Sequence, residues 1–157
     1  MVVNAHGPTP QKVDEKIEID ATIDQTWAIL KNFDQISIWH PDVKSSKGDG
    51  KNESDGVRTL TLSGGDLVES LDYYSEKDHE YNYRLKTENT DALPASSYTA
   101  TIQLVEDGGK TLVKWKSRLY RGDTGNSPPE KLNDESAVKA MNTFVKQGLK
   151  GLKEAVE

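Results

Sequence analysis

Hydrophobic and polar residues alternate over residues 12–21, where Val13, Ile17 and Ile19 share one parity and charged residues occupy the other. An alternation with a period of two predicts a strand with one face buried and the other in water. Similar patterns, rich in β-branched and aromatic residues, recur further along the chain. They predict strands over residues 56–62, 67–76, 80–88, 97–106 and 111–121, and a weaker, polar edge strand over 43–50.

Short turns separate these predicted strands, among them SGGD at 63–66, EKDH at 76–79 and DGGK at 107–110. The Asp107-Gly108 pair is a strong hairpin signal, because glycine readily adopts the positive φ angles that tight hairpin turns require. Hairpins at such regular spacing predict an antiparallel meander.

The hydrophobic period changes to that of a helix after residue 21. Trp27 and Leu30 fall on one face of this helix, and Asp24 is expected to cap its start. A second short helix is expected over residues 34–39. It ends before Pro41, because the residue that precedes a proline is disfavoured in the helical region.

A long helix is predicted over residues 129–157, with Pro129 in its first turn. Apolar or small residues that fall near one face of this helix are Ala137, Met141, Phe144, Val145, Gly148, Leu152 and Val156. Gly148 and Gly151 each cost about 1 kcal/mol relative to alanine in a helix interior. Either they allow the helix to approach the sheet closely, or they mark a kink.

This order of elements predicts an α+β fold. A curved antiparallel sheet of about seven strands wraps around the long C-terminal helix, and two short helices follow the first strand. The inner face of such a sheet either fills with side chains or leaves a cavity for a ligand. The length of 157 residues suits a single domain, expected over residues 12–157 after a flexible segment at 1–11.

Composition narrows the possible partners. The chain carries a net charge of −6 and shows no basic stripe in its sequence, so nucleic acid is not an expected partner. It contains no Cys, which excludes disulfides, thiolate catalysis and Cys-ligated metal sites. No apolar run reaches the ~18 residues of a membrane span.

The opening of the chain bears on its location. The stretch NAH at 4–6 is similar to the residues that flank a signal-peptidase cleavage site. A periplasmic location is therefore expected, with a cytoplasmic location as the alternative.

Several stretches together resemble one known group of proteins. They are FDQISIWHPDVKSS (33–46), the hairpin GVRTLTLSGGDLVESLDYYSEKDHEYNYRL (56–85), ALPASSYTATIQL (92–104) and TLVKWKSRLY (111–120). They resemble the START/Bet v 1 (SRPBCC) superfamily, the polyketide cyclase-like and lipid-transport-like group, over about residues 12–156. The resemblance implies the helix-grip fold. Its members host many activities, so fold alone does not decide function.

Two subgroups look most similar. One is the bacterial subgroup that includes MxaD, a periplasmic accessory protein of methanol oxidation, which implies a dehydrogenase or a cytochrome as protein partner. The other is the plant abscisic-acid receptors, in which a gate loop and a latch loop close over the ligand. Residues 63–66 and 91–96 occupy those loop positions here, and His40 stands where the receptors place an anion-anchoring Lys.

Four candidate site residues are polar or lie next to a polar residue in the sequence. Trp39 either walls a cavity or plugs the core, and His40 either contacts a ligand or caps a helix end. Arg58 and Glu69 share the parity of neighbouring Leu residues, so both are expected to point inward and to meet across the SGGD hairpin. Such charges must be paired, either as a structural ion pair or as a polar group that orients a ligand.

Aromatic and apolar side chains form the rest of the candidate site: Tyr81, Tyr83, Tyr98, Trp115, Met141 and Phe144. Facing each other from the strands and the long helix, they either line a pocket for a flat or apolar molecule or form a filled core.

Three functions follow. The first is a non-enzymatic binding protein with a hydrophobic cavity for a small apolar or amphipathic ligand, with loops 63–66 and 91–96 as its lid. The second is a periplasmic accessory protein, and the third is a cyclase-like enzyme whose acid–base groups would come from His40, Glu69 or a Tyr. The chain lacks the motifs of serine hydrolases, zinc proteases and nucleotide-binding loops, so no catalytic residue, metal or cofactor is predicted.

Overall fold

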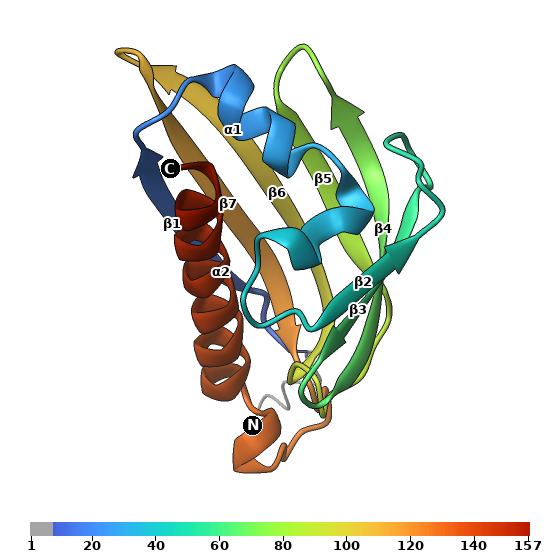
Figure 1. Ribbon diagram of the computed structural model, residues 1–157. Coiled ribbons are helices and arrows are strands. Elements are labelled where there is room, and N and C mark those ends of the chain that lie inside the picture. Colours follow the sequence, from blue (N-terminus) through green and yellow to red (C-terminus); the bar gives the residue numbers. More distant parts are fainter. Residues whose placement is uncertain (1–7) are drawn as a thin grey trace.

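The computed structural model describes residues 8–157 and shows one sheet gripping one long helix (Figure 1). The strands are β1 (Gln11–Ile19), β2 (Ser45–Gly48), β3 (Val57–Leu62), β4 (Gly65–Ser75), β5 (Glu80–Thr87), β6 (Ala95–Asp107) and β7 (Lys110–Arg121). The helices are α1 (Ile23–Leu30), η1 (Phe33–Ile38), η2 (Glu130–Leu132) and α2 (Asp134–Val156), of which η1 and η2 are 3₁₀ helices.

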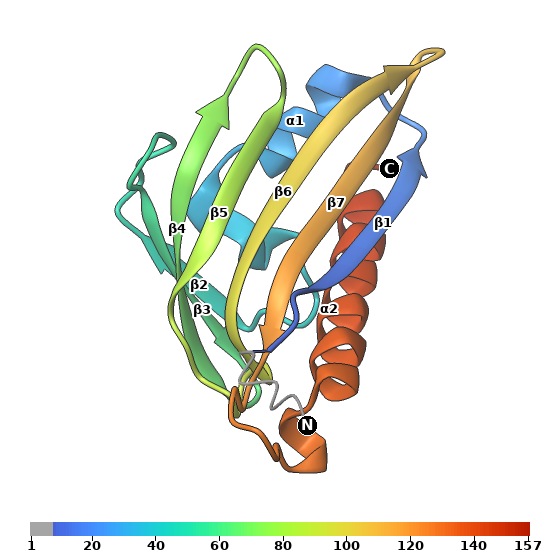
Figure 2. The same ribbon diagram turned by 180° about the vertical axis from the view of Figure 1, so that it is seen from behind.

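The sheet has seven strands in the order β1-β7-β6-β5-β4-β3-β2, and every neighbouring pair is antiparallel. It curves around α2, while α1 and η1 cross the same inner face (Figure 1). Among residues 8–157, no helix covers the outer face of the sheet (Figure 2). This is the helix-grip α+β fold, as expected.

The ends of the meander are joined by a long-range pairing. Strand β1, the first in the chain, pairs along its whole length with β7, from Gln11 opposite Leu119 to Ile19 opposite Thr111. Both strands contribute buried side chains beneath α2, including Val13 and Trp115. The short polar strand β2 lies at the other edge of the sheet, where the weak signal at 43–50 placed it.

Two predicted helix starts are wrong. Thr22, not Asp24, caps α1: its hydroxyl accepts a hydrogen bond from the Gln25 N–H, while the Gln25 side chain accepts one from the Thr22 N–H. Likewise Pro129 does not open the long helix. It precedes the separate turn η2, and Asn133 caps α2 through the Ser136 N–H.

Gly148 and Gly151 give α2 close contacts instead of a kink. A Cβ at Gly148 would lie 2.6 Å from both His40 Cδ2 and Trp115 Cζ3. A Cβ at Gly151 would meet the Trp39 carbonyl oxygen and lie 2.6 Å from Pro41 Cδ. The helix therefore presents a glycine notch, Gly148 with Gly151, into which the Trp39–Pro41 segment fits.

The structure describes only part of the N-terminal segment. Residues 1–7, including the NAH stretch, lie outside the described residues, and Gln11 already belongs to β1. The division into a flexible segment and a domain over 12–157 stays a prediction. Within residues 8–157, no helix combines the length and the apolar character needed to cross a membrane.

We predict that Gly148→Ala destabilises the protein although alanine favours helices by about 1 kcal/mol. The added methyl group would overlap the His40 and Trp115 rings, and overpacking of this kind costs about 1–3 kcal/mol. Urea unfolding measures the difference, with Gln147→Ala at the exposed neighbouring position as the control. A Gly148→Ala protein as stable as the control would contradict the notch.

Candidate ligand-binding site

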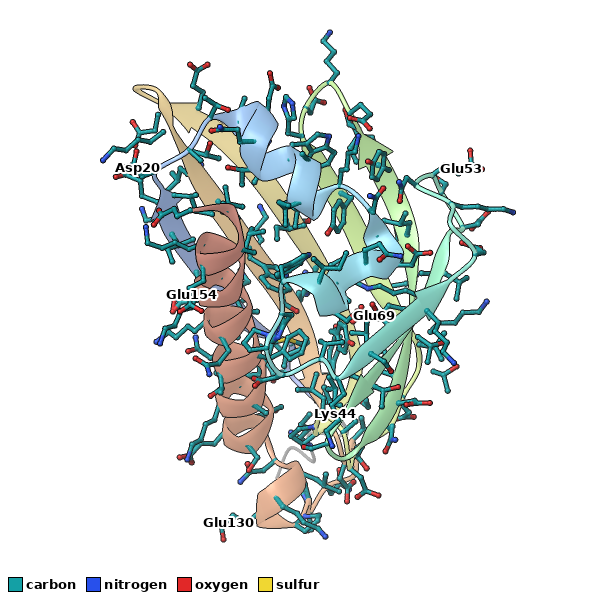
Figure 3. The ribbon with its side chains drawn as sticks, in the orientation of Figure 1. Asp20, Lys44, Glu53, Glu69, Glu130 and Glu154 are labelled. Atoms are coloured by element: carbon teal, nitrogen blue, oxygen red, sulfur yellow. The ribbon has the colours of Figure 1, made fainter. Side chains whose placement is uncertain are left out.

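The space between the sheet and the helices is occupied by side chains. All ten candidate site residues are buried, namely Trp39, His40, Arg58, Glu69, Tyr81, Tyr83, Tyr98, Trp115, Met141 and Phe144. Glu69 lies inside the fold, whereas Asp20, Glu53, Glu130 and Glu154 lie at its periphery (Figure 3). The ten residues thus lie together in the interior, where most of them contact one another.

Arg58 and Glu69 form an ion pair at the centre of the inner face. They lie directly opposite each other on β3 and β4, and both Nε and Nη2 of Arg58 approach Glu69 Oε1 at 2.8 Å. Their side chains are only 1% and 2% exposed. Burial acts to lower the pKa of Arg58, but the negative charge of Glu69 raises it, so the guanidinium stays charged.

Aromatic rings and a backbone carbonyl complete the surroundings of Arg58. Its guanidinium lies 4.1 Å from the centre of the Phe33 ring and 4.7 Å from that of Tyr83, within cation–π range. Its Nη1 also donates to the Phe33 carbonyl oxygen at 2.9 Å. A buried charge of this kind is tolerated only when such partners satisfy it.

Hydroxyl groups extend the polar network across the interior. The Tyr98 hydroxyl donates to Glu69 Oε2, and Trp115 Nε1 donates to the Tyr83 hydroxyl at 3.1 Å. The Tyr81 hydroxyl donates to the Leu30 carbonyl oxygen at 3.2 Å. Burial and the neighbouring Glu69 charge raise the pKa of Tyr98 well above its usual value. The Tyr81 and Tyr98 hydroxyls are therefore protonated donors committed to protein acceptors, and the Tyr83 hydroxyl is engaged as the acceptor of Trp115.

His40 ties the segment after η1 to α2. Its Nδ1 accepts a hydrogen bond from the Asp42 N–H at 3.1 Å, so Nε2 carries the proton and donates to the Phe144 carbonyl oxygen at 2.8 Å. The imidazole also stacks on the Phe144 ring, with centroids 4.0 Å apart. Burial lowers the pKa of His40 to about 4, although the hydrogen bond to Phe144 acts in the opposite direction. The ring is therefore neutral at pH 7.

Trp39 packs into the core beside His40. Its ring lies edge-on to Trp115 with centroids 5.7 Å apart, and the residue is 4% exposed. Its Nε1 finds no hydrogen-bond partner among the described residues. Of the two interpretations of this residue, the core position is the one that the geometry favours.

An open pocket of about 600 Å³ lies at one rim of the grip. Its walls come from the segment after His40, the β3–β4 turn, the loop before β6 and the first half of α2. The lining residues are Pro41, Asp42, Lys44, Leu62, Ser63, Ala92, Leu93, Ser136, Lys139, Ala140, Thr143 and Phe144. Phe144 is the one candidate site residue among them, and Lys44 lies between α2 and the β2–β3 pair (Figure 3).

The two predicted lid loops flank this pocket and touch each other. A Cβ at Gly64 would overlap the Asp91 carbonyl group and lie 3.0 Å from Ala92 Cα. Gly65 has a φ of 130°, a conformation that side chains rarely adopt. The glycine pair therefore allows close packing of the two loops and a tight turn.

A match to a protein-family model identifies the family of this chain. The model for polyketide cyclase / dehydrase and lipid transport proteins matches residues 10–157. The chain belongs to the polyketide cyclase/dehydrase and lipid transport family. Membership makes it an SRPBCC-type domain of the kind that binds ligands, while the MxaD-like and hormone-receptor similarities stay predictions.

Several solved structures are similar to this chain in fold. An uncharacterised protein from Bacillus thuringiensis has a TM-score of 0.76 and 25% identity, over 93% of this chain and 98% of that one. The protein XoxI from Bacillus cereus has a TM-score of 0.76 and 25% identity, over 92% and 94%. A protein from Nitrosospira multiformis has a TM-score of 0.75 at 21% identity, over 94% and 97%. No curated protein matches the chain.

Most residues that line the pocket were not predicted from the sequence. Lys44, Lys139 and Ala140 carry no motif, and they meet only because η1 and α2 are brought together by the glycine notch. The sequence signal for the pocket was the placement of loops 63–66 and 91–96 at lid positions, since both were expected beside a ligand.

We predict that Glu69→Gln lowers the free energy of unfolding by about 3–5 kcal/mol, because Arg58 would keep a buried charge without a counter-charge. Asp72→Asn is the matched control, because it breaks an exposed ion pair with Arg84 that is worth under about 1 kcal/mol. Chemical denaturation of both variants measures the contrast. Equal losses in the two variants would contradict the central role of the pair.

We predict that acid destabilises the protein through His40. Its pKa of about 4 lies below the ordinary 6.5 of the unfolded chain. The unfolded state therefore binds the extra proton first, and stability falls as pH drops from 6.5 towards 4. Relative to His40→Gln, the wild type should lose about 3 kcal/mol over that range. Parallel stability–pH profiles of the two proteins would refute this.

Proposed function

We propose that this protein is a non-enzymatic binding protein for a small amphipathic ligand, held in the rim pocket beside α2. The observation that carries the proposal is the pocket of about 600 Å³, which is bounded by both loops expected to form a lid. Its size falls in the range of small-molecule sites, which are mostly apolar with a few placed polar groups.

The lining favours a ligand with an apolar body and an anionic end. Leu62, Leu93 and Phe144 supply buried apolar surface to the walls of the pocket. Lys44 and Lys139 face the same space from the η1–β2 segment and from α2, and neither forms a salt bridge within residues 8–157. A carboxylate or a sulfonate on an alkyl or aromatic body would match both features.

The buried candidate residues act in this proposal as the support of the site. His40 holds the Phe144 carbonyl and ring on α2, and the Arg58–Glu69 pair fixes the strands that carry the β3–β4 turn. Of the ten candidate site residues, Phe144 is the one that contacts the ligand in this proposal. Binding sites depend on such supporting groups, because a loosely held lining cannot keep its geometry.

The geometry favours binding over the cyclase-like alternative. Both ring nitrogens of His40 are engaged in hydrogen bonds, and the Glu69 carboxylate is held by Arg58 and Tyr98. Neither group lines the pocket, whereas a general acid or base must reach the reacting atoms. The periplasmic accessory role, with a dehydrogenase or cytochrome as partner, stays a prediction.

We predict that filling the pocket abolishes binding. Ala140→Trp places an indole within the pocket lining, whereas Ala155→Trp adds the same group at an exposed site of the same helix. The fluorescent amphiphile anilinonaphthalene sulfonate should bind the wild type saturably and be displaced by decanoate more readily than by decanol. Ala140→Trp should weaken binding at least about tenfold, and Ala155→Trp should leave it unchanged.

Two outcomes would contradict the proposal. The first is a wild-type protein that binds neither the fluorescent amphiphile nor decanoate. The second is equal binding by the Ala140→Trp and Ala155→Trp variants, provided that both unfold cooperatively at similar denaturant concentrations. Displacement by decanol as readily as by decanoate would contradict the preference for a ligand with an anionic end. It would leave the proposed apolar pocket standing.

A further inference from the structure

Positive charge gathers on the outer face of the sheet, which none of the helices of the described part of the chain covers (Figure 2). Side chains of even number on β1 and β7 point outward, and six of them are exposed cations. Lys110 is paired with Glu18, and the other five are Lys12, Lys16, Lys114, Lys116 and Arg118. We call these five residues the basic strip. The absence of a basic stripe that the sequence analysis expected is therefore wrong for β7, where Lys114, Lys116 and Arg118 alternate, and the pairing of β1 with β7 adds Lys12 and Lys16.

The register places like charges directly opposite each other. Lys12 pairs with Arg118, and Lys16 pairs with Lys114. Like charges in such cross-strand positions destabilise a sheet. Asp14 lies between Lys12 and Lys16 on β1, opposite Lys116, and Glu18 and Glu80 border the strip. An arrangement that works against folding is expected where a surface serves binding.

The charges of the basic strip are also unpaired. Over residues 8–157, none of its five cations takes part in a salt bridge. Neighbouring charges on the same sheet do pair, since Lys110 reaches Glu18 at 3.5 Å and Arg84 reaches Asp72 at 2.8 Å. The strip is therefore a local excess of positive charge on a chain whose net charge is −6.

Two shallow hollows run along the strip. They measure about 350 Å³ and about 340 Å³, and both are lined by Asp14, Thr101 and Lys116. Thr99 lines one hollow, and Gln103 and Glu80 line the other. The Thr99, Thr101 and Gln103 side chains stand beside the cations as further hydrogen-bond donors to carboxylates, whereas the Glu80 carboxylate can only accept.

We propose that the basic strip is a docking surface for an acidic face of a partner protein. Complementary charge supports docking through faster encounter and correct register. Asp14 sits in the middle of the strip, where a protein partner can offer a Lys or Arg in return. A uniformly negative lipid bilayer or nucleic acid would instead be repelled at that point.

Other features of the outer face agree with a protein partner. The exposed large hydrophobic side chains of the described residues, Ile38 and Tyr73, lie on η1 and β4 and not on β1 or β7. The strip therefore lacks the apolar side chains that insert into a membrane interface. The exposed residues of β1 and β7 include no aromatic ring of the kind on which single-stranded bases stack.

One substitution in the strip should change docking and thermal stability in different directions. Lys114→Gln removes a charge needed for docking and also relieves the repulsion with Lys16. Docking should weaken while the midpoint of thermal unfolding stays the same or rises. A residue with a purely structural role would move both quantities downward.

The test uses a synthetic Glu-rich helical peptide as the acidic partner face and the full chain labelled for NMR. Saturable shifts should map to β1, β6 and β7, and they should fade as the ionic strength rises to about 0.15 M and beyond. Lys16→Gln/Lys114→Gln should weaken binding at least about fivefold. The control Lys150→Gln, an exposed position on α2, should leave it unchanged.

Parallel titrations with phosphatidylglycerol vesicles and duplex DNA separate the possible partners. Tighter binding to either of them than to the peptide would overturn the proposal. So would peptide shifts outside these three strands, no peptide binding at low salt, or equal effects of the strip and Lys150 variants. The rim pocket lies on the other side of the sheet, so these results are independent of ligand binding there.

Discussion

The buried ion pair between Arg58 and Glu69 constrains everything on the inner face of the sheet. Two charges removed from water need close partners, and here they receive Phe33, Tyr83 and Tyr98 as well as each other. These partners fill the middle of the grip with rings and committed hydroxyls. A ligand in that space would have to displace one of these partners, and for this reason the site that we propose is the pocket at the rim.

The second constraint is the glycine notch of α2. Because Gly148 and Gly151 have no side chains, the Trp39–Pro41 segment lies directly against the helix, and His40 donates to the Phe144 carbonyl. That contact positions the next residues of the segment as one wall of the rim pocket and Phe144 as another. Core packing and the proposed site are thus two consequences of the same close approach.

Local patterns in the sequence predicted what depends on local geometry. The inward pairing of Arg58 and Glu69 followed from strand parity and one hairpin turn, and the structure agrees. The start of α2 was misplaced because Pro129 suits a first turn in general, while Asn133 provides the actual cap. Features that join distant segments were out of reach. The basic strip needs the pairing of β1 with β7, and the rim pocket needs four separate segments.

The location of a bound amphiphile tests this account most directly. In a crystal structure of the complex with decanoate, we expect the alkyl chain against Leu93, Ala140 and Phe144, with the Arg58–Glu69 contact intact. An alkyl chain between the sheet and the core rings, with that ion pair broken, would contradict the account.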